Sequence, residues 1–327
     1  MSFKALVSRQ REDGSITSQV ETLEDDALPD GNVTVAIDHA GLNYKDAFCL
    51  TGRGGLVRNY PNVAGIDFAG TVEDSSDDRY KPGDGVILTG WRVGELHWGG
   101  YSQKQRVNAD WLVPLPKSLD ARKAMVLGTA GLTAMLAITR LEELGIHPDS
   151  GTILVTGASG GVGSISIMLL KTLGYKVAAL TGKPGELDFQ ALGADEIVER
   201  QGFMAPEDRP IDSARYAGAI DTVGGSILGR VLKQISYGGA VASLGNAAGI
   251  DFETSVLPFI LRGVTLAGID SVMQPYDPRV IAWERLGKLF DFDKYEALVE
   301  EIGLEGLPDA ADRILDGKIK GRVLVTP

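Results

Sequence analysis

The chain has 327 residues, enough for one large domain or two ordinary ones, and its 44% apolar and 23% charged residues are typical of a soluble globular protein. Its formal net charge of −12 argues against nucleic acid and anionic membrane surfaces as partners. The single cysteine, Cys49, excludes an intrachain disulfide framework and a Cys-rich metal site. Because we find no secretory signal and no apolar stretch long enough to span a bilayer, we expect a cytoplasmic protein without a membrane partner.

The first part of the chain, residues 1–122, is rich in short strand-like runs. Residues 32–40 alternate polar and apolar side chains, and further apolar runs lie at 68–72 and 86–88 between glycine and proline turns. This pattern predicts a small β-rich or barrel-like domain.

A helical pattern follows, because apolar residues recur at helical spacing from residue 121 to residue 144. Gly128 and Gly131 lie inside this stretch. Since glycine lowers helix stability, we expect a kink or close packing at these positions.

From residue 152 onward, strands alternate with helices, which predicts a parallel sheet covered on both faces, a doubly wound α/β fold. The predicted strands are 153–155, 177–180, 197–198, 217–220, 240–244 and 264–269, and the predicted helices are 162–173, 186–192 and 227–235. A helical stretch after residue 295 precedes a strand-like run at 321–325, which we expect to return to the first domain.

A glycine-rich turn joins the first of these strands to the first of these helices, with the sequence Gly157-Ala158-Ser159-Gly160-Gly161-Val162-Gly163. Small residues let the backbone approach phosphates, and a helix N-terminus supplies N–H donors and the positive end of the helix dipole. The alternative is a turn that is tight for packing reasons alone. The strand before it and the helix after it favour a site for a dinucleotide pyrophosphate.

The end of the next strand indicates which nicotinamide cofactor is bound. NAD sites usually carry Asp or Glu there, to accept hydrogen bonds from the ribose hydroxyls. Here the strand ends in Thr181-Gly182-Lys183, and Arg200 follows the strand after it. A hydroxyl and cations suit a 2′-phosphate. We therefore expect NADPH, the alternative being that both cations are solvated surface charges.

The sequence resembles the medium-chain dehydrogenase/reductase superfamily, and within it the zinc-independent acrylyl-CoA reductase branch (AcuI/YhdH-type), often labelled quinone oxidoreductase. The segments that carry the resemblance are GLNYKD at 41–46, PNVAGIDFAG at 61–70, LTGW at 88–91, HWGG at 97–100, DARKAM at 120–125, residues 155–164, AIDTVG at 219–224 and LPFILR at 257–262. The resemblance implies a GroES-like catalytic domain formed by residues 1–122 and 296–327, around a Rossmann NADPH-binding domain formed by residues 123–295.

Zinc-dependent members of the superfamily hold their metal with a Cys in the first of these segments and a His-Glu pair in the second. The matching positions here read Asn43-Tyr44-Lys45-Asp46 and Gly65-Ile66-Asp67. Zinc needs three or four converging ligands, and the three histidines are spread along the chain. We therefore expect no metal, and reduction of a conjugated acceptor instead of alcohol oxidation.

The resemblance also implies the site residues. Tyr44 is our first candidate for a catalytic residue that lies over the nicotinamide and the substrate, the alternative being a tyrosine packed at a strand end. Asn43 and Asp67 are further catalytic candidates, although Asp67 has the alternative of capping a turn. Lys45-Asp46 reads as an exposed pair or a helix start.

The remaining candidates concern the cofactor. The resemblance points to residues 159–162 for the pyrophosphate, and strand ends in such a sheet point to two later loops for the nicotinamide half. Arg322 matches a basic position of the family, and its alternative is a surface charge on an edge strand. The cofactor candidates are Tyr44, Ser159, Gly160, Gly161, Val162, Thr181, Gly182, Lys183, Arg200, Leu244, Asn246, Ile269, Ser271 and Arg322.

The function implied by the branch is NADPH-dependent reduction of the C2=C3 bond of acryloyl-CoA to propionyl-CoA, with hydride delivered to the β-carbon. Two alternatives stay open: an NADPH quinone oxidoreductase on the same fold, and a non-catalytic NADPH-binding sensor. We expect a small-molecule acyl-CoA as the partner, and a homodimer if residues 264–269 form an exposed sheet edge that pairs across a two-fold axis.

Overall fold

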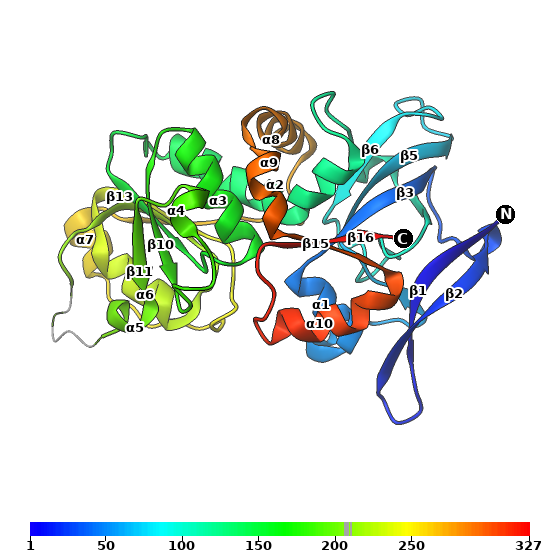
Figure 1. Cartoon of the computed structure of the whole chain (residues 1–327), viewed down its shortest axis with the longest axis horizontal. Coiled ribbons are helices and arrows are strands. Elements are labelled where there is room, and N and C mark those ends of the chain that lie inside the picture. The colour runs from blue at the N-terminus through cyan, green and yellow to red at the C-terminus, as the bar shows by residue number, and fades with distance from the viewer. Residues whose placement is uncertain (206–208, 210) are drawn as a thin grey trace. The chain divides into compact units, whose positions relative to one another are not determined.

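The computed structural model describes residues 1–205, 209 and 211–327, and the chain divides into two compact units. Unit 1 comprises Met1–Thr129, Ser271–Gly287 and Glu296–Pro327, and unit 2 comprises Ala130–Asp270 and Lys288–Tyr295. Figure 1 colours the chain from blue at the N-terminus to red at the C-terminus, so that its path can be traced. The chain therefore crosses from one unit to the other four times.

Unit 2 is built on a parallel sheet of six strands in the order β11-β10-β9-β12-β13-β14. In chain order this reads 3-2-1-4-5-6, the order of dinucleotide-binding folds. The strands are β9 (Thr152–Thr156), β10 (Lys176–Thr181), β11 (Glu196–Glu199), β12 (Tyr216–Asp221), β13 (Ile235–Ser243) and β14 (Thr265–Gly268). Each predicted strand is confirmed.

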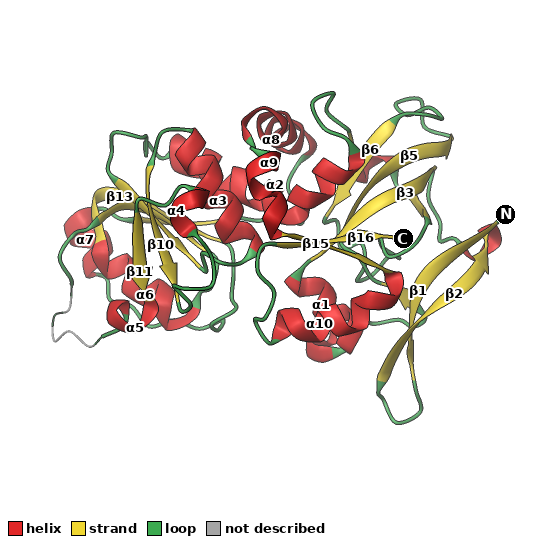
Figure 2. Ribbon diagram, viewed as in Figure 1, coloured by secondary structure: helices red, strands yellow, loops and turns green. Residues whose placement is uncertain are grey.

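Helices lie around this sheet, as Figure 2 shows. They are α3 (Gly161–Thr172), α4 (Phe189–Leu192), α5 (Arg200–Phe203), α6 (Gly225–Gln234) and α7 (Leu257–Arg262). The short helix α9 (Phe292–Tyr295) also belongs to unit 2. The predicted helix at 186–192 is wrong in its first half. Helix α4 begins only at Phe189, because the Asp188 side chain accepts from the Ala191 amide at 2.8 Å and so caps the helix there.

Unit 1 is β-rich, as predicted. Its larger sheet has the order β15-β16-β3-β5-β6-β8 with β7 paired to β3, and a smaller sheet has the order β2-β1-β4. The strands are β1 (Ser2–Gln10), β2 (Ile16–Glu24), β3 (Val33–Leu42), β4 (Asn62–Val63), β5 (Asp67–Ser75), β6 (Gly85–Thr89), β7 (Lys104–Val107), β8 (Leu112–Pro114), β15 (Val299–Gly303) and β16 (Arg322–Thr326). Helices α1 (Tyr44–Thr51) and α10 (Leu307–Leu315) also belong to it.

The C-terminal strand returns to the first part of the chain, as expected. Strand β16 pairs antiparallel with β3, with Val323 opposite Leu42 and Val325 opposite Ala40. These side chains join the apolar core of unit 1. The pairing brings Arg322, at the start of β16, beside the end of β3.

Helix α2 (Ala121–Glu143) bends at Gly128, which has φ 52° and ψ −152°. A side chain at this position would meet Arg322 Nη2 at 2.7 Å and Asp67 Oδ2 at 2.9 Å. The kink predicted from the glycine is therefore confirmed, and close packing against buried charged groups is its physical reason.

The expectation that no segment has the length and composition to span a bilayer is wrong for α2. Its most apolar 18-residue window has a mean hydropathy of 1.5. However, 83% of that window is buried inside the structure, as in the core helix of a globular protein.

Residues 271–287 belong to unit 1, whereas the sequence analysis assigned them to the dinucleotide-binding domain. Helix α8 (Tyr276–Leu289) carries Arg279, whose side chain is buried and donates to Thr89 O and Oγ1 at 2.7 and 2.8 Å. The same guanidinium donates to Val272 O at 2.8 Å and lies 4.8 Å from the Trp91 ring centroid. A buried guanidinium needs these acceptors, so it fixes the segment to the end of β6. The first junction between the units also lies after Thr129, beyond the predicted boundary at 122.

Candidate cofactor and active site

The turn between β9 and α3 requires glycine at two positions. Gly157 has φ 59°, a left-handed conformation that L side chains rarely adopt. A Cβ on Gly163 would lie 2.3 Å from the Gly157 carbonyl oxygen. The helix therefore packs directly on the strand end, as the three-glycine pattern of dinucleotide sites requires.

The N-terminus of α3 is open to a ligand. Its N-cap is Gly160, which has no side chain to accept from the first-turn amides. The first N–H groups of a helix have no intrahelical partner, and together with the helix dipole they bind anions. Residues 159–162 are half-buried. The four predicted pyrophosphate residues thus form a cradle that fits a diphosphate.

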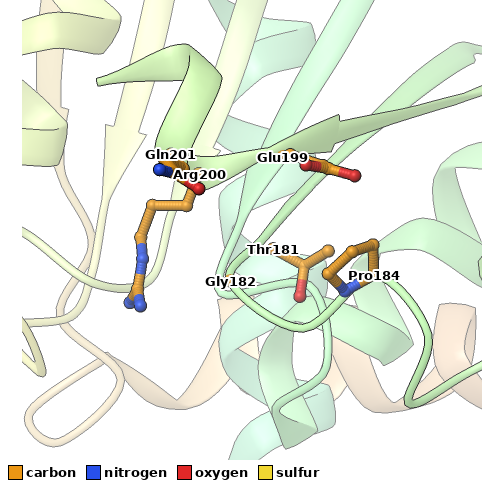
Figure 3. Close-up of a pocket in the computed structure, with 6 residues that line it drawn as sticks. All are labelled: Thr181, Gly182, Pro184, Glu199, Arg200 and Gln201. Atoms are coloured by element: carbon orange, nitrogen blue, oxygen red, sulfur yellow. The ribbon is translucent and has the colours of Figure 1, made fainter. Parts of the chain in front are cut away.

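A pocket of about 250 Å³ lies at the ends of β10 and β11. Its lining residues are Thr181, Gly182, Pro184, Glu199, Arg200 and Gln201 (Figure 3).

The Arg200 side chain extends toward the loop at Gly182, where an added Cβ would lie 2.8 Å from the guanidinium carbon. The Lys183 amide donates to Thr181 Oγ1 at 3.0 Å. The Glu199 carboxylate points away from the guanidinium (Figure 3). A cation stacked over a glycine loop, beside a hydroxyl, fits a ribose 2′-phosphate.

The later strand ends lie on the same edge of this sheet. Asp221, at the end of β12, is buried and accepts from Thr156 Oγ1 at 2.8 Å and from the Gly224 amide at 2.9 Å. Burial raises its pKa. The amide of Leu244 donates to Asp221 O and that of Ile269 to Ser243 O, each at 3.0 Å.

The structure therefore brings most of the predicted cofactor residues of unit 2 to one sheet edge, Asn246 included. Ser271 lies in unit 1, two residues beyond Ile269 in the chain.

In unit 1, the end of β3 leads into α1 through Asn43 and Tyr44. Asn43 caps the helix with Asp46: its amide N–H donates to Asp46 Oδ2 at 2.9 Å, and the Ile66 amide donates to Asp46 Oδ1 at 2.8 Å. Asp46 has no exposed surface. The prediction that residues 45–46 begin a helix is confirmed. The alternative, that they form an exposed pair, is wrong for Asp46, which is buried. Burial, followed by the charge of Asp67, raises the pKa of Asp46 to about 7.

Asp67 begins β5, and its side chain is completely buried. Its carboxylate accepts from the Gly41 amide at 3.0 Å, from Asn43 Nδ2 at 2.9 Å and from the Thr129 amide at 2.7 Å. These donors come from β3, the following turn and α2. Asp67 thus joins its own strand, β5, to the turn between β3 and α1 and to α2. This role is larger than the turn cap of the alternative interpretation.

Arg322 completes this buried polar network, which we define as Asn43, Asp46, Asp67 and Arg322. Its Nε donates to Val126 O at 3.0 Å, and its Nη1 donates to Leu42 O at 3.1 Å and to Asn43 Oδ1 at 3.3 Å. Its Nη2 is buried without a hydrogen-bond partner. The alternative of a surface charge on an edge strand is wrong, because Arg322 is 4% exposed and β16 lies between β15 and β3.

Tyr44 presents an aromatic surface next to this network. Its side chain is 38% exposed, and its ring makes an edge-to-face contact with Phe48, the centroids being 5.2 Å apart. It is the first residue of α1 and directly follows Asn43. Tyr44 is thus a partly exposed aromatic residue at the start of a helix whose N-cap, Asn43, belongs to the buried network.

Sequence reasoning missed two members of this site. The Asn43-x-x-Asp46 spacing is that of a helix capping pair, a signal that would have indicated the role of Asp46. Tyr101 donates to the Gly41 carbonyl at 3.1 Å and is fully buried, which raises the pKa of its phenol. No sequence pattern predicts that contact.

Within the part of the chain that the structure describes, no three His, Cys, Asp or Glu side chains are grouped as metal ligands would be. The cation that contacts Asn43 is the Arg322 guanidinium. Most donors and acceptors of the network pair with one another, whereas Arg322 Nη2 has no hydrogen-bond partner.

Comparisons with known proteins find matches to both parts of the chain. Residues 29–117 match the family described as "Alcohol dehydrogenase GroES-like domain", and residues 161–285 match "Zinc-binding dehydrogenase". The chain is 54% identical over 325 residues to "Acrylyl-CoA reductase AcuI" of Ruegeria pomeroyi, covering 99% of this chain and 98% of that protein.

Two solved structures share the whole fold. The yhdH oxidoreductase from Salmonella enterica, in complex with NADP, is 48% identical with a TM-score of 0.95, covering 100% of both chains. The yhfP protein of Bacillus subtilis, with NAD bound, is 41% identical with a TM-score of 0.96, again over 100% of both chains. The chain therefore belongs to the acrylyl-CoA reductase AcuI family of the medium-chain dehydrogenase/reductase superfamily.

Proposed function

We propose that this protein reduces the C2=C3 bond of acryloyl-CoA with NADPH, giving propionyl-CoA, in the cytoplasm. The observation that carries the proposal is the 54% identity, over nearly the whole length of both chains, to a protein named acrylyl-CoA reductase. The pocket at Thr181 and Arg200 supports the choice of NADPH over NADH. The acidic composition is in keeping with a small-molecule partner.

Bound NADPH supplies the hydride that the β-carbon of the enoyl thioester accepts. In unit 2, the α3 N-terminus holds the pyrophosphate, and the Thr181–Lys183 loop with Arg200 holds the 2′-phosphate. Leu244, Asn246 and Ile269 support the nicotinamide half. Their common role is to fix the cofactor at the carboxyl edge of the sheet.

The residues of unit 1 orient the acceptor and stabilise charge. We assign to Tyr44 a double role, in which its ring packs on the nicotinamide and its phenol donates to the thioester oxygen as negative charge develops there. Asn43 and Asp67 hold the turn from which Tyr44 projects, so they act as positioning residues. Arg322 holds the same turn through its bonds to Leu42 O and Asn43 Oδ1, and because its guanidinium is buried it acts on the ligand through that turn.

A quinone is the second candidate acceptor. It is favoured by one relative, 42% identical over 325 residues, that is named "Putative quinone oxidoreductase YhfP". A quinone needs an aromatic slot and no site for CoA phosphates. The third alternative, an NADPH sensor, would bind the cofactor and turn over neither acceptor.

We further propose a homodimer formed along β14. This strand is the edge of the unit 2 sheet. Exposed apolar side chains occur in β13, in α7 and in the segment between them: Tyr237 86%, Ile250 80%, Val256 64%, Ile260 69% and Leu261 58%. An open edge beside such a surface favours pairing with a second copy.

The dimer is tested by sedimentation. Analytical ultracentrifugation is expected to give twice the chain mass of 34.7 kDa. Ile260→Glu should shift the protein to the single-chain mass, because it places a charge in the apolar surface. Ile281→Glu, on the 57% exposed Ile281 of α8, is the control and should remain dimeric. A single-chain mass for the wild type contradicts the proposal.

The reaction is tested by following NADPH oxidation with acryloyl-CoA, crotonyl-CoA and a small quinone, with NADH as cofactor control and a chelator present. We expect acryloyl-CoA with NADPH to be strongly preferred, with no loss of rate in chelator. Turnover of the quinone without any acyl-CoA activity contradicts the proposal in favour of the second candidate. Cofactor binding without turnover of any acceptor favours the sensor.

The assignment of Tyr44 is tested by Tyr44→Phe, which keeps the ring and removes the donor. We expect kcat for acryloyl-CoA to fall about tenfold or more, with little change in the Kd of NADPH, because the lost hydrogen bond strengthens only as charge develops. Asp67→Asn, which removes the charge that orients the turn, should lower kcat by a similar or larger factor. Tyr276→Phe, on the 42% exposed Tyr276, is the matched control. Unchanged kcat in Tyr44→Phe contradicts the assignment.

The 2′-phosphate site is tested by Arg200→Ala. We expect the Kd of NADPH to rise about tenfold, and that of NADH to stay the same, because only NADPH loses a charge-assisted hydrogen bond. Lys176→Ala is the control, since Lys176 lies at the opposite end of β10. An equal rise in the Kd values of NADPH and NADH means that Arg200 does not bind the 2′-phosphate.

A further inference from the structure

A buried serine lies beneath the phosphate-binding turn. Ser164, in the first turn of α3, has no exposed surface. Its hydroxyl donates to the Gly160 carbonyl at 2.8 Å, and the Gly161 carbonyl is 3.3 Å away. The Ser164 amide donates to the same Gly160 carbonyl at 2.9 Å. That carbonyl therefore receives two hydrogen bonds from the helix side.

The serine hydroxyl has a second partner, which comes from a distant part of the chain. The hydroxyl of Tyr295, the last residue of α9, lies 2.7 Å from Ser164 Oγ, and Tyr295 is fully buried. A serine hydroxyl carries one proton, and Ser164 uses it toward Gly160. Tyr295 must therefore donate to Ser164. The tyrosine ring is fixed by an edge-to-face contact with Phe290, with the centroids 5.1 Å apart.

These bonds act on a peptide group of the proposed pyrophosphate cradle, the one between Gly160 and Gly161. The Gly160 carbonyl and the Gly161 N–H belong to the same planar, trans peptide, so they point in opposite directions. Holding the carbonyl toward Ser164 aims the Gly161 N–H out of the helix, where the pyrophosphate is expected. Gly160 has no side chain that could fix the plane of this peptide, and the residues before and after it, Ser159 and Gly161, are small. The helical hydrogen bond from the Ser164 amide holds this carbonyl, and the Ser164 hydroxyl adds a second bond to it.

We propose that Tyr295 and Ser164 form a positioning pair for the pyrophosphate of the dinucleotide, in which Tyr295 donates to Ser164 and Ser164 holds the Gly160–Gly161 peptide. Hydrogen bonds in such a chain polarise one another, so the Tyr295 bond also strengthens the N–H that meets the phosphate. The proposal rests on the cofactor use proposed above, and it does not depend on the identity of the acceptor.

The position of Tyr295 in the chain gives the pair a second consequence. Tyr295 ends the segment Lys288–Tyr295 of unit 2, and the next residue, Glu296, belongs to unit 1. Occupation of the phosphate site and order of this crossover segment are therefore linked through one hydroxyl. Because linkage is reciprocal, NADPH should protect the segment from hydrogen exchange.

The test measures the Kd of NADPH for the full-length protein by isothermal titration calorimetry. Tyr295→Phe removes only the hydroxyl, and we expect the Kd to rise about three- to tenfold, the size of one neutral hydrogen bond. Ser164→Ala removes both bonds and should raise it further. Tyr175→Phe is the matched control, because its buried hydroxyl donates to the Ile146 carbonyl at 2.9 Å in the same unit, away from the turn. Its Kd should equal that of the wild type.

The double variant Ser164→Ala/Tyr295→Phe separates positioning from general destabilisation. If Tyr295 acts through Ser164, the double variant binds NADPH no more weakly than Ser164→Ala alone. Additive losses, or a Kd for Tyr295→Phe equal to that of Tyr175→Phe, overturn the proposal. Hydrogen exchange of residues 288–295 with and without NADPH is the second readout, and protection should disappear in Tyr295→Phe. A wild type that binds NADPH but leaves acryloyl-CoA unreduced counts against the proposed reaction only.

Discussion

Burial of charged groups is the constraint on which unit 1 depends. Asp46 and Asp67 have no exposed surface and Arg322 has 4%, and a charge removed from water is tolerated only when other groups replace its hydration. The groups that replace the hydration lie at the last residues of β3, at the first residues of β5 and β16, and at the bend of α2. Those segments must therefore meet at one point for any of the charges to be buried. Gly41 and Gly128 lie at that point, where a Cβ on either would come within 3 Å of both Arg322 and Asp67. The position of the C-terminal strand is thus dictated by electrostatics as much as by the apolar pairing of Val323 and Val325.

In unit 2 the charge comes from the ligand and not from buried side chains. The sheet edge must therefore present hydrogen-bond donors that have no partner within the protein. Glycine at the N-cap of α3 leaves the first amides open, and the absence of an acidic residue at the end of β10 leaves Arg200 available. Asp221 at this edge is already paired inside the protein, with Thr156 and the Gly224 amide. Local cations are needed because the chain as a whole carries −12 and repels a polyanionic cofactor at long range.

The parts of this structure that the sequence predicts are those set by local patterns. The strands of unit 2 and the glycine turn follow from apolar periodicity and from backbone geometry, which act within a few residues. The return of 321–325 was indicated by its β-type apolar run. The packing of residues 271–287 in unit 1 could not be predicted, because it depends on Arg279 reaching Thr89, a contact between residues 190 apart that leaves no periodic signal. The burial of Asp46 and Arg322 was missed for a related reason: each looks like a surface charge until the partners from other segments are known. The Tyr295–Ser164 contact spans 131 residues and leaves no trace in the sequence either.

The charges of the buried polar network also explain why the pKa of Asp46 is raised. Arg322 supplies one positive charge to the network, and the Asp67 side chain accepts from the Gly41 and Thr129 amides. A second full negative charge at Asp46 would be buried without a cation of its own, so its pKa rises to about 7. Asp46 is nevertheless kept close to its capping geometry by the Asn43 and Ile66 amides, whatever its protonation state. The turn that carries Tyr44 is therefore held by hydrogen bonds that a neutral or a charged Asp46 can both accept, and its geometry depends chiefly on the pairing of Asp67 and Arg322 through Asn43.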